Sequence, residues 1–230
     1  MNIAIVGATG NVGRKTLEVL EKKGLTLGNL YLVASSKSAG KKIHFQGKDI
    51  VVSELENFDF SKVKIAFFAA GGKISEKFAE KAAKHCLVID NSSFFRMDPD
   101  VPLIVPQVNS DALKNVKKNI IANPNCSTAQ LVIALKPLHD LFVIKRIVVS
   151  TYQSVSGAGK ASMDELIKQT KLALDGKDIK SENFTKPIAF NAIPHIDVFS
   201  EDGYTKEELK MKNETKKILD DKIDLTATCV

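Results

Sequence analysis

Cys126 is the residue of this sequence best placed to do chemistry. It follows a turn-forming Asn-Pro-Asn at 123–125 and precedes a mostly apolar run at 129–135. This order predicts a helix that begins at or just after Cys126, where backbone N–H groups and the helix dipole favour a thiolate. A thiolate is a nucleophile, and the same N–H groups could hold the oxyanion formed when it attacks an acyl carbon. The alternative is a buried structural cysteine behind a polar cap.

A glycine-rich turn near the N-terminus predicts a second site. The apolar segment 3–6 reads as a strand, the glycines follow, and a helical pattern begins after them. Gly7 permits a tight turn, Gly10 lets a pyrophosphate approach the backbone, and Gly13 lets the helix pack closely on the strand. We therefore expect a dinucleotide site at the start of this helix, formed by Gly7, Thr9, Gly10, Asn11, Val12 and Gly13.

The second predicted strand, 30–34, should end near the adenosine ribose of that dinucleotide. NAD-specific folds usually carry an acidic residue there, which binds the ribose 2′-hydroxyl. This chain instead has Ser35, Ser36, Lys37 and Ser38. Hydroxyl groups around a cation suit a 2′-phosphate, so the sequence predicts NADP rather than NAD. An ordinary solvated basic loop is the alternative.

Composition restricts the class of protein. The chain has 230 residues, 44% of them hydrophobic, which is enough for one large core or two modest ones. We expect a cytoplasmic protein without a membrane partner, because no segment is apolar enough to span a bilayer and no signal pattern precedes the first strand. The three cysteines lack metal-ligand spacing, so we expect reduced thiols and no metal. The net charge of +6 is interleaved with acids, which favours small anions over nucleic acid as partners.

Periodicity predicts an α/β fold in two parts. Short apolar runs alternate with helical or loop segments up to about residue 125, at 3–6, 30–34, 50–52, 65–70, 87–89 and 120–122. This alternation is typical of a largely parallel sheet wrapped by helices, so residues 1–125 are expected to form a Rossmann-like NADP-binding domain. Such sheets bind ligands in the loops at the carboxyl ends of their strands.

The pattern changes after Cys126. We expect helices at 129–141, 160–174 and from 206 onward, and strands at 146–155, 187–192 and 225–230, with a polar linker near 175–185. Residues 126–230 therefore read as a mixed α+β domain.

Five motifs together resemble the aspartate-β-semialdehyde dehydrogenases. They are GATGNVG at 7–13, NSSFFR at 91–96, NPNCSTAQ at 123–130, YQSVSGAG at 152–159 and YTKEELKM at 204–211. The resemblance covers essentially the whole chain. It implies that the cysteine attacks the acyl phosphate of β-aspartyl phosphate, phosphate leaves, and NADPH reduces the thioester to aspartate semialdehyde. It also implies a homodimer that serves the biosynthesis of lysine, threonine, methionine and diaminopimelate.

The resemblance assigns roles to individual residues. Cys126 resembles the nucleophile, Gln153 the residue that positions the reacting carbonyl, Arg96 and Lys210 the phosphate binders, and Glu207 the partner of the substrate amino group. Further positions implied are Asn125, Ser156 and Gly157 for substrate, and Ala70, Gly71, Asn91 and Gly157 for the cofactor. Without the resemblance, Arg96 reads as a surface ion-pair partner and Gln153 as a buried, hydrogen-bonded amide.

The helix expected from 206 onward has its own start signal. Thr205 and Glu208 have the spacing of a capping box, and Glu207 and Lys210 lie three residues apart, so both can face one side of the helix. Without the resemblance, this spacing favours a surface salt bridge.

The sequence departs from the family pattern at its end. Family members continue past the strand that 226–230 matches, with an arginine that binds the substrate carboxylate and a histidine that acts as general acid/base. Neither matches a residue here, and His195, on a predicted turn, is only a distant substitute. We therefore expect an incomplete second domain and weak turnover. Two alternatives remain open: another acylating reductase such as N-acetyl-γ-glutamyl-phosphate reductase, and a non-catalytic module that binds NADP.

Overall fold

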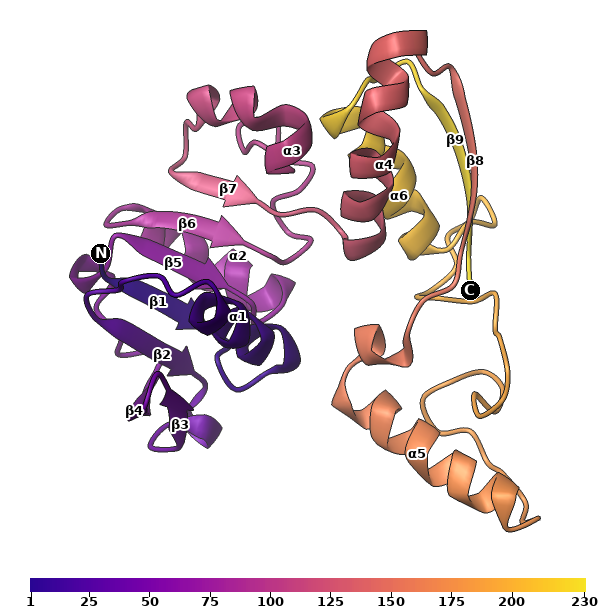
Figure 1. Ribbon diagram of the computed structural model, residues 1–230, viewed down its shortest axis with the longest axis horizontal. Helices are drawn as coiled ribbons and strands as arrows, with labels where there is room; N and C mark the ends of the chain where they lie inside the picture. The colour runs from indigo at the N-terminus through magenta and orange to yellow at the C-terminus, as the bar shows by residue number, and fades with distance from the viewer. The chain divides into compact units, whose positions relative to one another are not determined.

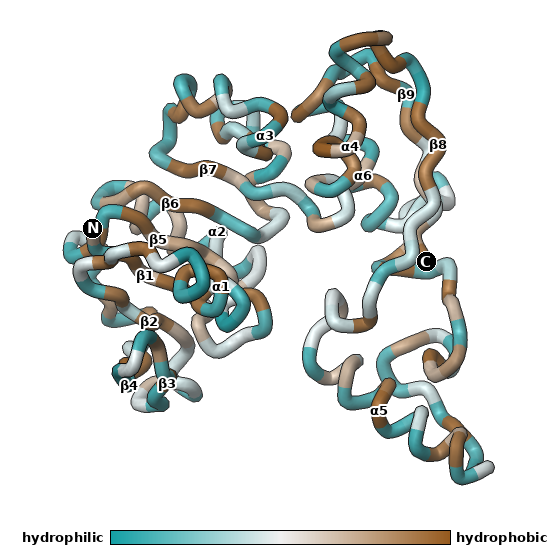
Figure 2. Tube along the Cα trace, viewed as in Figure 1, coloured by the Kyte–Doolittle hydropathy of each residue, from teal (hydrophilic) through white to brown (hydrophobic).

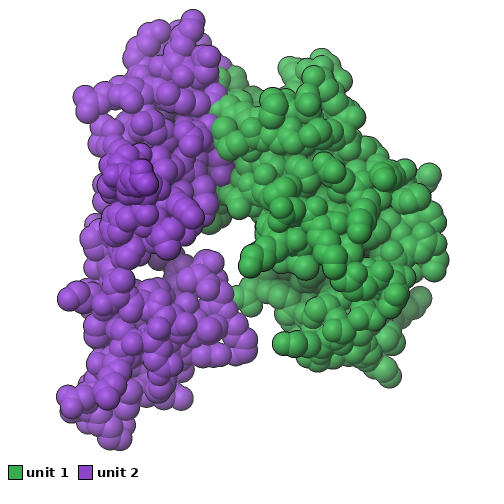
Figure 3. Space-filling view, turned by 180° about the vertical axis from the view of Figure 1, so that it is seen from behind, with its two compact units in different colours: residues 1–137, 217–219 green, residues 138–216, 220–230 purple.

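The computed structural model describes residues 1–230, which fold into two compact units. Unit 1 comprises 1–137 and 217–219, and unit 2 comprises 138–216 and 220–230 (Figure 3). The boundary between the units falls within helix α4 (Cys126–Phe142). The functional domain boundary at residue 125 stays a prediction. No helix has the length and apolar character needed to cross a bilayer.

Unit 1 contains the Rossmann-like sheet that the sequence predicts. Its strands are β1 (Ile3–Val6), β2 (Leu30–Ala34), β3 (Lys42–Phe45), β4 (Lys48–Glu54), β5 (Ile65–Phe68), β6 (Leu87–Asp90) and β7 (Ile120–Ala122). The seven strands are arranged in the order β3-β4-β2-β1-β5-β6-β7 (Figure 1). All neighbours run parallel except β3 and β4. The carboxyl ends of β1, β2, β5 and β6 therefore lie along one edge of the sheet.

Helices cover both faces of this sheet. Successive side chains of a strand point to opposite faces, so the apolar strands have two faces to bury. Ile5 joins the core under α1 (Asn11–Lys22), whereas Val6 joins the core under α2 (Gly72–Ala83). Figure 2 shows the central strands as largely hydrophobic, as expected for strands buried on both faces. Short helical segments complete unit 1: α3 (Pro106–Asn109), η1 (Ser36–Ser38), η2 (Phe60–Lys62) and η3 (Ser110–Asn115).

The strands listed from the sequence do not include β3, which forms an antiparallel hairpin with β4. The turn residues Gln46 and Gly47 both have positive φ, at 46° and 77°, which suits a tight two-residue hairpin turn. Ile43 and Phe45 are buried, whereas His44 between them is exposed. The period-two pattern was present in the sequence, but it extends over only four residues.

Unit 2 combines a two-stranded parallel sheet with helices. Its elements include β8 (Arg146–Thr151), β9 (Asp224–Cys229), η4 (Val155–Ala158), α5 (Lys160–Leu174) and most of α6 (Lys206–Ile218). The helix expected at 160–174 is confirmed, as is the start of a helix at residue 206. The strand expected at 146–155 ends earlier, at Thr151. Ser154 turns the chain there, because its side chain accepts a hydrogen bond from the Ser156 N–H and begins η4.

The strand expected at 187–192 is wrong, because this segment is irregular. Gln169 of α5 is almost fully buried, and its side-chain oxygen accepts the N–H groups of Ile188 (2.7 Å) and Ala189 (3.1 Å). Phe190 has φ of 57°, which no strand residue adopts. These backbone N–H groups therefore bind a side chain rather than a neighbouring strand.

Candidate active site

Cys126 is the first residue of α4, as the sequence predicts. Asn125 caps the helix: its side-chain oxygen accepts the Ser127 N–H at 2.9 Å and also the Ser127 hydroxyl, while its main-chain carbonyl accepts the Ala129 N–H at 2.9 Å. Asn125 and Ser127 are buried, whereas Cys126 is exposed. A fixed helix N-terminus thus presents a solvent-accessible thiol, which excludes the alternative of a buried structural cysteine.

The other two cysteines are in apolar surroundings. Cys86 is buried, its sulfur lies 3.4 Å from the Ala82 carbonyl oxygen, and burial raises the pKa of its thiol to about 11. Cys229 is buried with its sulfur 3.6 Å from that of Met211. Neither is positioned to act as a nucleophile, because both solvent access and thiolate formation favour reaction.

A buried carboxylate fixes the loop that follows β6. Asp90 is fully buried and accepts hydrogen bonds from the Ser75 hydroxyl (2.6 Å), the Ser92 N–H (3.1 Å) and the Ser92 hydroxyl (2.7 Å). These bonds fix the backbone on both sides of Asn91, one of the expected cofactor-binding residues. Sequence analysis did not single out Asp90, although an acidic residue that ends an apolar strand and precedes two serines was a usable signal.

Arg96 connects this loop to the one that leads to the cysteine. Its Nε donates to the Asn123 carbonyl oxygen (3.0 Å) and its Nη2 to that of Asn91 (3.1 Å). Arg96 is only 8% exposed, so it is not the surface residue that the sequence alternative describes. Arg96 therefore has a structural role, because its guanidinium joins the main chains of two loops.

Lys217 holds the same loop by its backbone. Its ammonium donates to the carbonyl oxygens of Arg96 (2.8 Å), Asp98 (2.7 Å) and Val101 (2.9 Å). Burial lowers the pKa of Lys217. Nothing local in the sequence signals these contacts, because the lysine lies far along the chain from all three acceptors.

The glycine turn has the backbone geometry of a dinucleotide-binding loop. Gly7 has φ of 86°, and a Cβ there would lie 2.7 Å from the Ala69 carbonyl oxygen. A Cβ on Gly13 would overlap the Gly7 carbonyl, so α1 approaches β1 as closely as the sequence reading requires. Gly10 caps α1, and its N–H donates to the Gly7 carbonyl at 3.0 Å. No side chain caps the N-terminus of α1 by a hydrogen bond.

The other expected cofactor residues follow neighbouring strands at the same edge of the sheet. Ser35, Ser36, Lys37 and Ser38 follow β2, Ala70 and Gly71 follow β5, and Asn91 follows β6. The Thr9 hydroxyl lies 3.4 Å from that of Ser38, so the glycine turn and the serine-rich turn are in contact. Lys37 is exposed on η1. The structure thus gathers these residues where parallel α/β sheets bind nucleotides.

In unit 2 the predicted capping box starts α6. The Thr205 N–H donates to a Glu208 carboxylate oxygen at 2.7 Å, and the Glu208 N–H donates to the Thr205 hydroxyl at 3.3 Å. The other oxygen of Glu208 accepts the Cys229 N–H of β9 at 3.3 Å. These bonds fix the first turn of the helix that carries Glu207 and Lys210.

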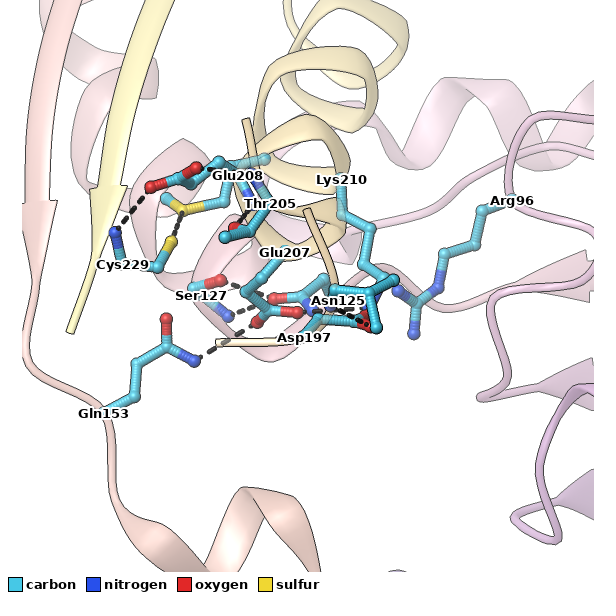
Figure 4. Close-up of polar contacts among 12 residues, drawn as sticks. Arg96, Asn125, Ser127, Gln153, Asp197, Thr205, Glu207, Glu208, Lys210 and Cys229 are labelled. Atoms are coloured by element: carbon cyan, nitrogen blue, oxygen red, sulfur yellow. Dashed lines mark hydrogen bonds and ion pairs between the residues drawn. The ribbon is translucent and has the colours of Figure 1, made fainter. Parts of the chain in front are cut away.

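Four polar side chains of unit 2 form what we call the Lys210 network: Gln153, Glu207, Lys210 and Asp197 (Figure 4). The Lys210 ammonium lies 2.8 Å from Asp197 and 3.2 Å from Glu207, whose other oxygen accepts the Gln153 amide N–H at 3.2 Å. The Gln153 side-chain oxygen accepts the Thr151 hydroxyl at 2.9 Å. Sequence analysis predicted three members of the network and missed Asp197.

The network perturbs both partners of its shorter ion pair. Although burial opposes the charged form, hydrogen bonding to Lys210 holds the pKa of Asp197 below its usual range. Burial likewise opposes the charge on Lys210, but Asp197 and Glu207 raise its pKa above the usual value. Both groups are therefore charged at neutral pH.

The predicted site residues divide between the two units. Unit 1 carries the cofactor residues at the sheet edge together with Arg96, Asn125 and Cys126, and unit 2 carries Gln153, Ser156, Gly157, Glu207 and Lys210. Ser156 and Gly157 are exposed on η4. No three His, Cys, Asp or Glu side chains cluster in a way that would hold a metal ion.

Comparison with known proteins shows the family of the chain. The family model for the NAD binding domain of semialdehyde dehydrogenases matches residues 2–116, and that for their dimerisation domain matches residues 135–230. An aspartate-semialdehyde dehydrogenase from Aquifex aeolicus (strain VF5) is 55% identical over 99% of this chain and 68% of its own length.

Solved structures give the same result. Aspartate semialdehyde dehydrogenase II from Vibrio cholerae, complexed with ASA, matches 99% of this chain and 69% of that chain with a TM-score of 0.96 and 52% identity. The Candida albicans enzyme with NADP matches 99% of this chain and 66% of that chain, with a TM-score of 0.68 and 28% identity. With a nucleotide-type sheet edge, a helix-terminal cysteine and these relatives, the chain belongs to the aspartate-semialdehyde dehydrogenase family, whose members are phosphorylating aldehyde dehydrogenases.

Proposed function

We propose that this chain converts β-aspartyl phosphate to aspartate β-semialdehyde through a thioester on Cys126. The observation that carries the proposal is the exposed thiol at the capped N-terminus of α4. The Cys126 sulfur attacks the acyl carbon, the bond from that carbon to the phosphate oxygen breaks, and inorganic phosphate leaves. NADPH, when bound, supplies the hydride that converts the thioester to the aldehyde. The thiolate of Cys126 is then released.

The surrounding residues of the chain orient the substrate and balance its charge. Arg96 and Lys210 offer N–H donors to the phosphate, and Glu207 offers a carboxylate to the substrate amino group. The Gln153 amide, held by Thr151 and Glu207, is proposed to donate to the reacting carbonyl. Asn125, Ser156 and Gly157 complete the proposed substrate contacts. The complex of the Vibrio cholerae relative with ASA supports a substrate of this class.

We further propose that the cofactor is NADP. The turn at 35–38 has hydroxyl groups and the exposed Lys37 where an NAD site would carry a carboxylate. The Candida albicans relative, whose structure contains NADP, supports this choice. The family model for a dimerisation domain likewise supports a homodimer. The pathways proposed to use the product are those of lysine, threonine, methionine and diaminopimelate.

Capture of the acyl-enzyme tests the chemistry directly. We expect that incubation with β-aspartyl phosphate in the absence of NADPH adds one aspartyl group to the peptide containing Cys126, as measured by mass spectrometry. Addition of NADPH should then remove the adduct. Cys126→Ser should give no thioester, and the buried Cys86 serves as an internal control. A non-catalytic NADP-binding module would bind the cofactor but leave Cys126 unmodified, and that outcome would refute the proposal.

A further inference from the structure

Asp197 is the closest charged partner of Lys210, and the proposed reaction gives it no role. It approaches Lys210 from the loop that precedes α6, and its carboxylate lies 2.8 Å from the ammonium, compared with 3.2 Å for Glu207. The side chain of Lys210 is 28% exposed and that of Glu207 is 8% exposed. The ammonium thus bonds to two carboxylates in a partly desolvated position, where such contacts are strong.

The backbone of Asp197 is held in an unusual conformation. Its φ is 69°, a left-handed value that few residues other than glycine adopt, although Asp and Asn tolerate it best. One carboxylate oxygen accepts the Val198 N–H at 2.9 Å, which leaves the other for Lys210. Strained backbone of this kind is found preferentially where the position of a side chain matters.

The loop around Asp197 is fixed to the start of α6. The Lys206 N–H donates to the Val198 carbonyl at 2.9 Å, and the Ser200 N–H donates to the Tyr204 carbonyl at 2.7 Å. The loop therefore has little freedom to move its carboxylate away from Lys210.

Because Asp197 is a second carboxylate partner of Lys210, Glu207 does not have to keep its own bond to the ammonium. In the proposed reaction Lys210 binds the substrate phosphate and Glu207 binds the substrate amino group. A closed pair between Lys210 and Glu207 alone would neutralise both groups and compete with both substrate contacts. Asp197 can stay bonded to Lys210 when Glu207 exchanges the ammonium for the substrate amino group, so the Lys210 side chain keeps its position.

We propose that Asp197 is a positioning residue that holds the Lys210 ammonium in place for the substrate phosphate. Glu207 is thereby left available to the substrate amino group. This inference rests on the proposed function. Asp197 itself touches neither the reacting carbon nor the cofactor in this proposal. Its effect is on substrate binding and not on the chemical step.

Asp197→Asn tests the charge of this residue with little change to the backbone. Asparagine tolerates the same left-handed conformation and keeps an oxygen for the Val198 N–H, but it removes the charge facing Lys210. The matched control is Asp202→Asn in the same loop. Asp202 is exposed and its side chain accepts only the Tyr204 N–H, at 3.2 Å. Asp197→Gly relieves the backbone and also removes the carboxylate.

Two binding measurements follow, with inorganic phosphate and β-aspartyl phosphate as the ligands. The affinity for phosphate should fall about tenfold in both Asp197 variants, because a Lys210 side chain without this partner must be ordered when phosphate binds, and it should stay unchanged in Asp202→Asn. The concentration of β-aspartyl phosphate that gives half the limiting rate of adduct formation on Cys126 should rise by a similar factor. The limiting rate itself should change by less than about twofold, because the nucleophile is untouched.

The outcomes separate this inference from the proposed function. If Asp197→Asn binds phosphate like the unchanged chain while the Cys126 adduct forms normally, the positioning role is refuted and the proposed function stands. If only the limiting rate falls, Asp197 acts on the chemical step and the inference is equally wrong. If Asp197→Gly retains full affinity, backbone conformation rather than charge was responsible. An unchanged chain that forms no adduct and binds no phosphate would overturn both proposals.

Discussion

The Lys217 ammonium lies 2.8 Å from the main-chain carbonyl oxygen of Arg96, which connects the end of α6 to the loop that orients the arginine side chain. Its other two acceptors, Asp98 and Val101, belong to the same loop. One lysine therefore satisfies three carbonyl groups that no strand or helix pairs. Arg96 is held at two places. Its side-chain Nε and Nη2 donate to main-chain carbonyl groups, and its own main-chain carbonyl accepts the Lys217 ammonium. The position of the guanidinium therefore depends on this loop.

Lys217→Met should therefore loosen the loop at 96–101. Loss of the charged hydrogen bonds leaves the carbonyl groups without this donor, at a cost of about 2–3 kcal/mol. Amide hydrogen exchange of residues 91–101 should become faster, and the midpoint of urea unfolding should fall. Lys216→Met, one residue earlier, removes the same charge but none of these three bonds. Equal effects of the two substitutions would contradict the anchoring role.

Alkylation should distinguish the three cysteines. Limiting iodoacetamide at neutral pH should label Cys126 first, because it is exposed whereas Cys86 and Cys229 are buried. The pKa of Cys86, about 11, leaves almost no thiolate at neutral pH. Peptide mapping of the folded protein checks the order, and mapping in denaturant should abolish it. Faster labelling of Cys86 or Cys229 in the folded chain would weaken the assignment of Cys126 as nucleophile.

Lys37→Glu should reverse the cofactor preference. We expect the unchanged chain to bind NADPH more tightly than NADH, since Lys37 and the serines at the end of β2 suit a 2′-phosphate. A glutamate would repel that phosphate and could bond to the ribose hydroxyls of NADH. Lys48→Glu is the matched control. Lys48 is also exposed, but it begins β4 and so lies at the amino ends of the parallel strands, away from the turn that follows β2. Equal affinity of the unchanged chain for both cofactors, measured by fluorescence titration, would disprove the preference.

Glu165 should make the stability of unit 2 depend on pH. It is buried on α5 and accepts the N–H groups of Glu182 (2.8 Å) and Asn183 (2.7 Å). Although burial opposes ionisation, these bonds hold the pKa of Glu165 below its usual value of 4.5. The stabilisation is therefore complete above pH 4.5 and is lost as the pH falls through the lower pKa of the folded state.

Glu165→Gln should accordingly lower the melting temperature at neutral pH, and the difference from the unchanged chain should shrink below pH 4.5. Asp164→Asn is the control, because Asp164 forms only an exposed pair with Lys160, and such pairs contribute little. A constant difference across this pH range would mean that packing, not ionisation, accounts for the effect.

The parts of the structure that depend on local sequence were predictable. The start of α4 at Cys126 and the capping box at Thr205 and Glu208 follow from residues within a few positions of one another. The strands of the parallel sheet were equally clear, because buried strands have nearly continuous apolar sequences.

The features that were missed depend on contacts between distant segments. The strand expected at 187–192 does not form, because Gln169 on α5 binds its backbone N–H groups. Lys217 and Asp197 have no signature in the sequence, because an ordinary lysine or aspartate gains its role only when the fold brings its partner near. The roles of the individual site residues thus stay predictions that the proposed experiments test.

The pairing of β8 with β9 has a consequence for the rate of folding. Arg146 pairs with Asp224 and Thr151 with Cys229, so the strands meet only after the long intervening segment, with α5 and α6, has closed into a loop. Closing a loop of this length costs entropy before its contacts form, and parallel pairs of this kind form slowly. The contact between Gln153 and Glu207 also closes a long loop within this segment, with a sequence separation of 54 residues. During refolding, we expect the Lys210 network to reach its final geometry well after the sheet of unit 1 has formed.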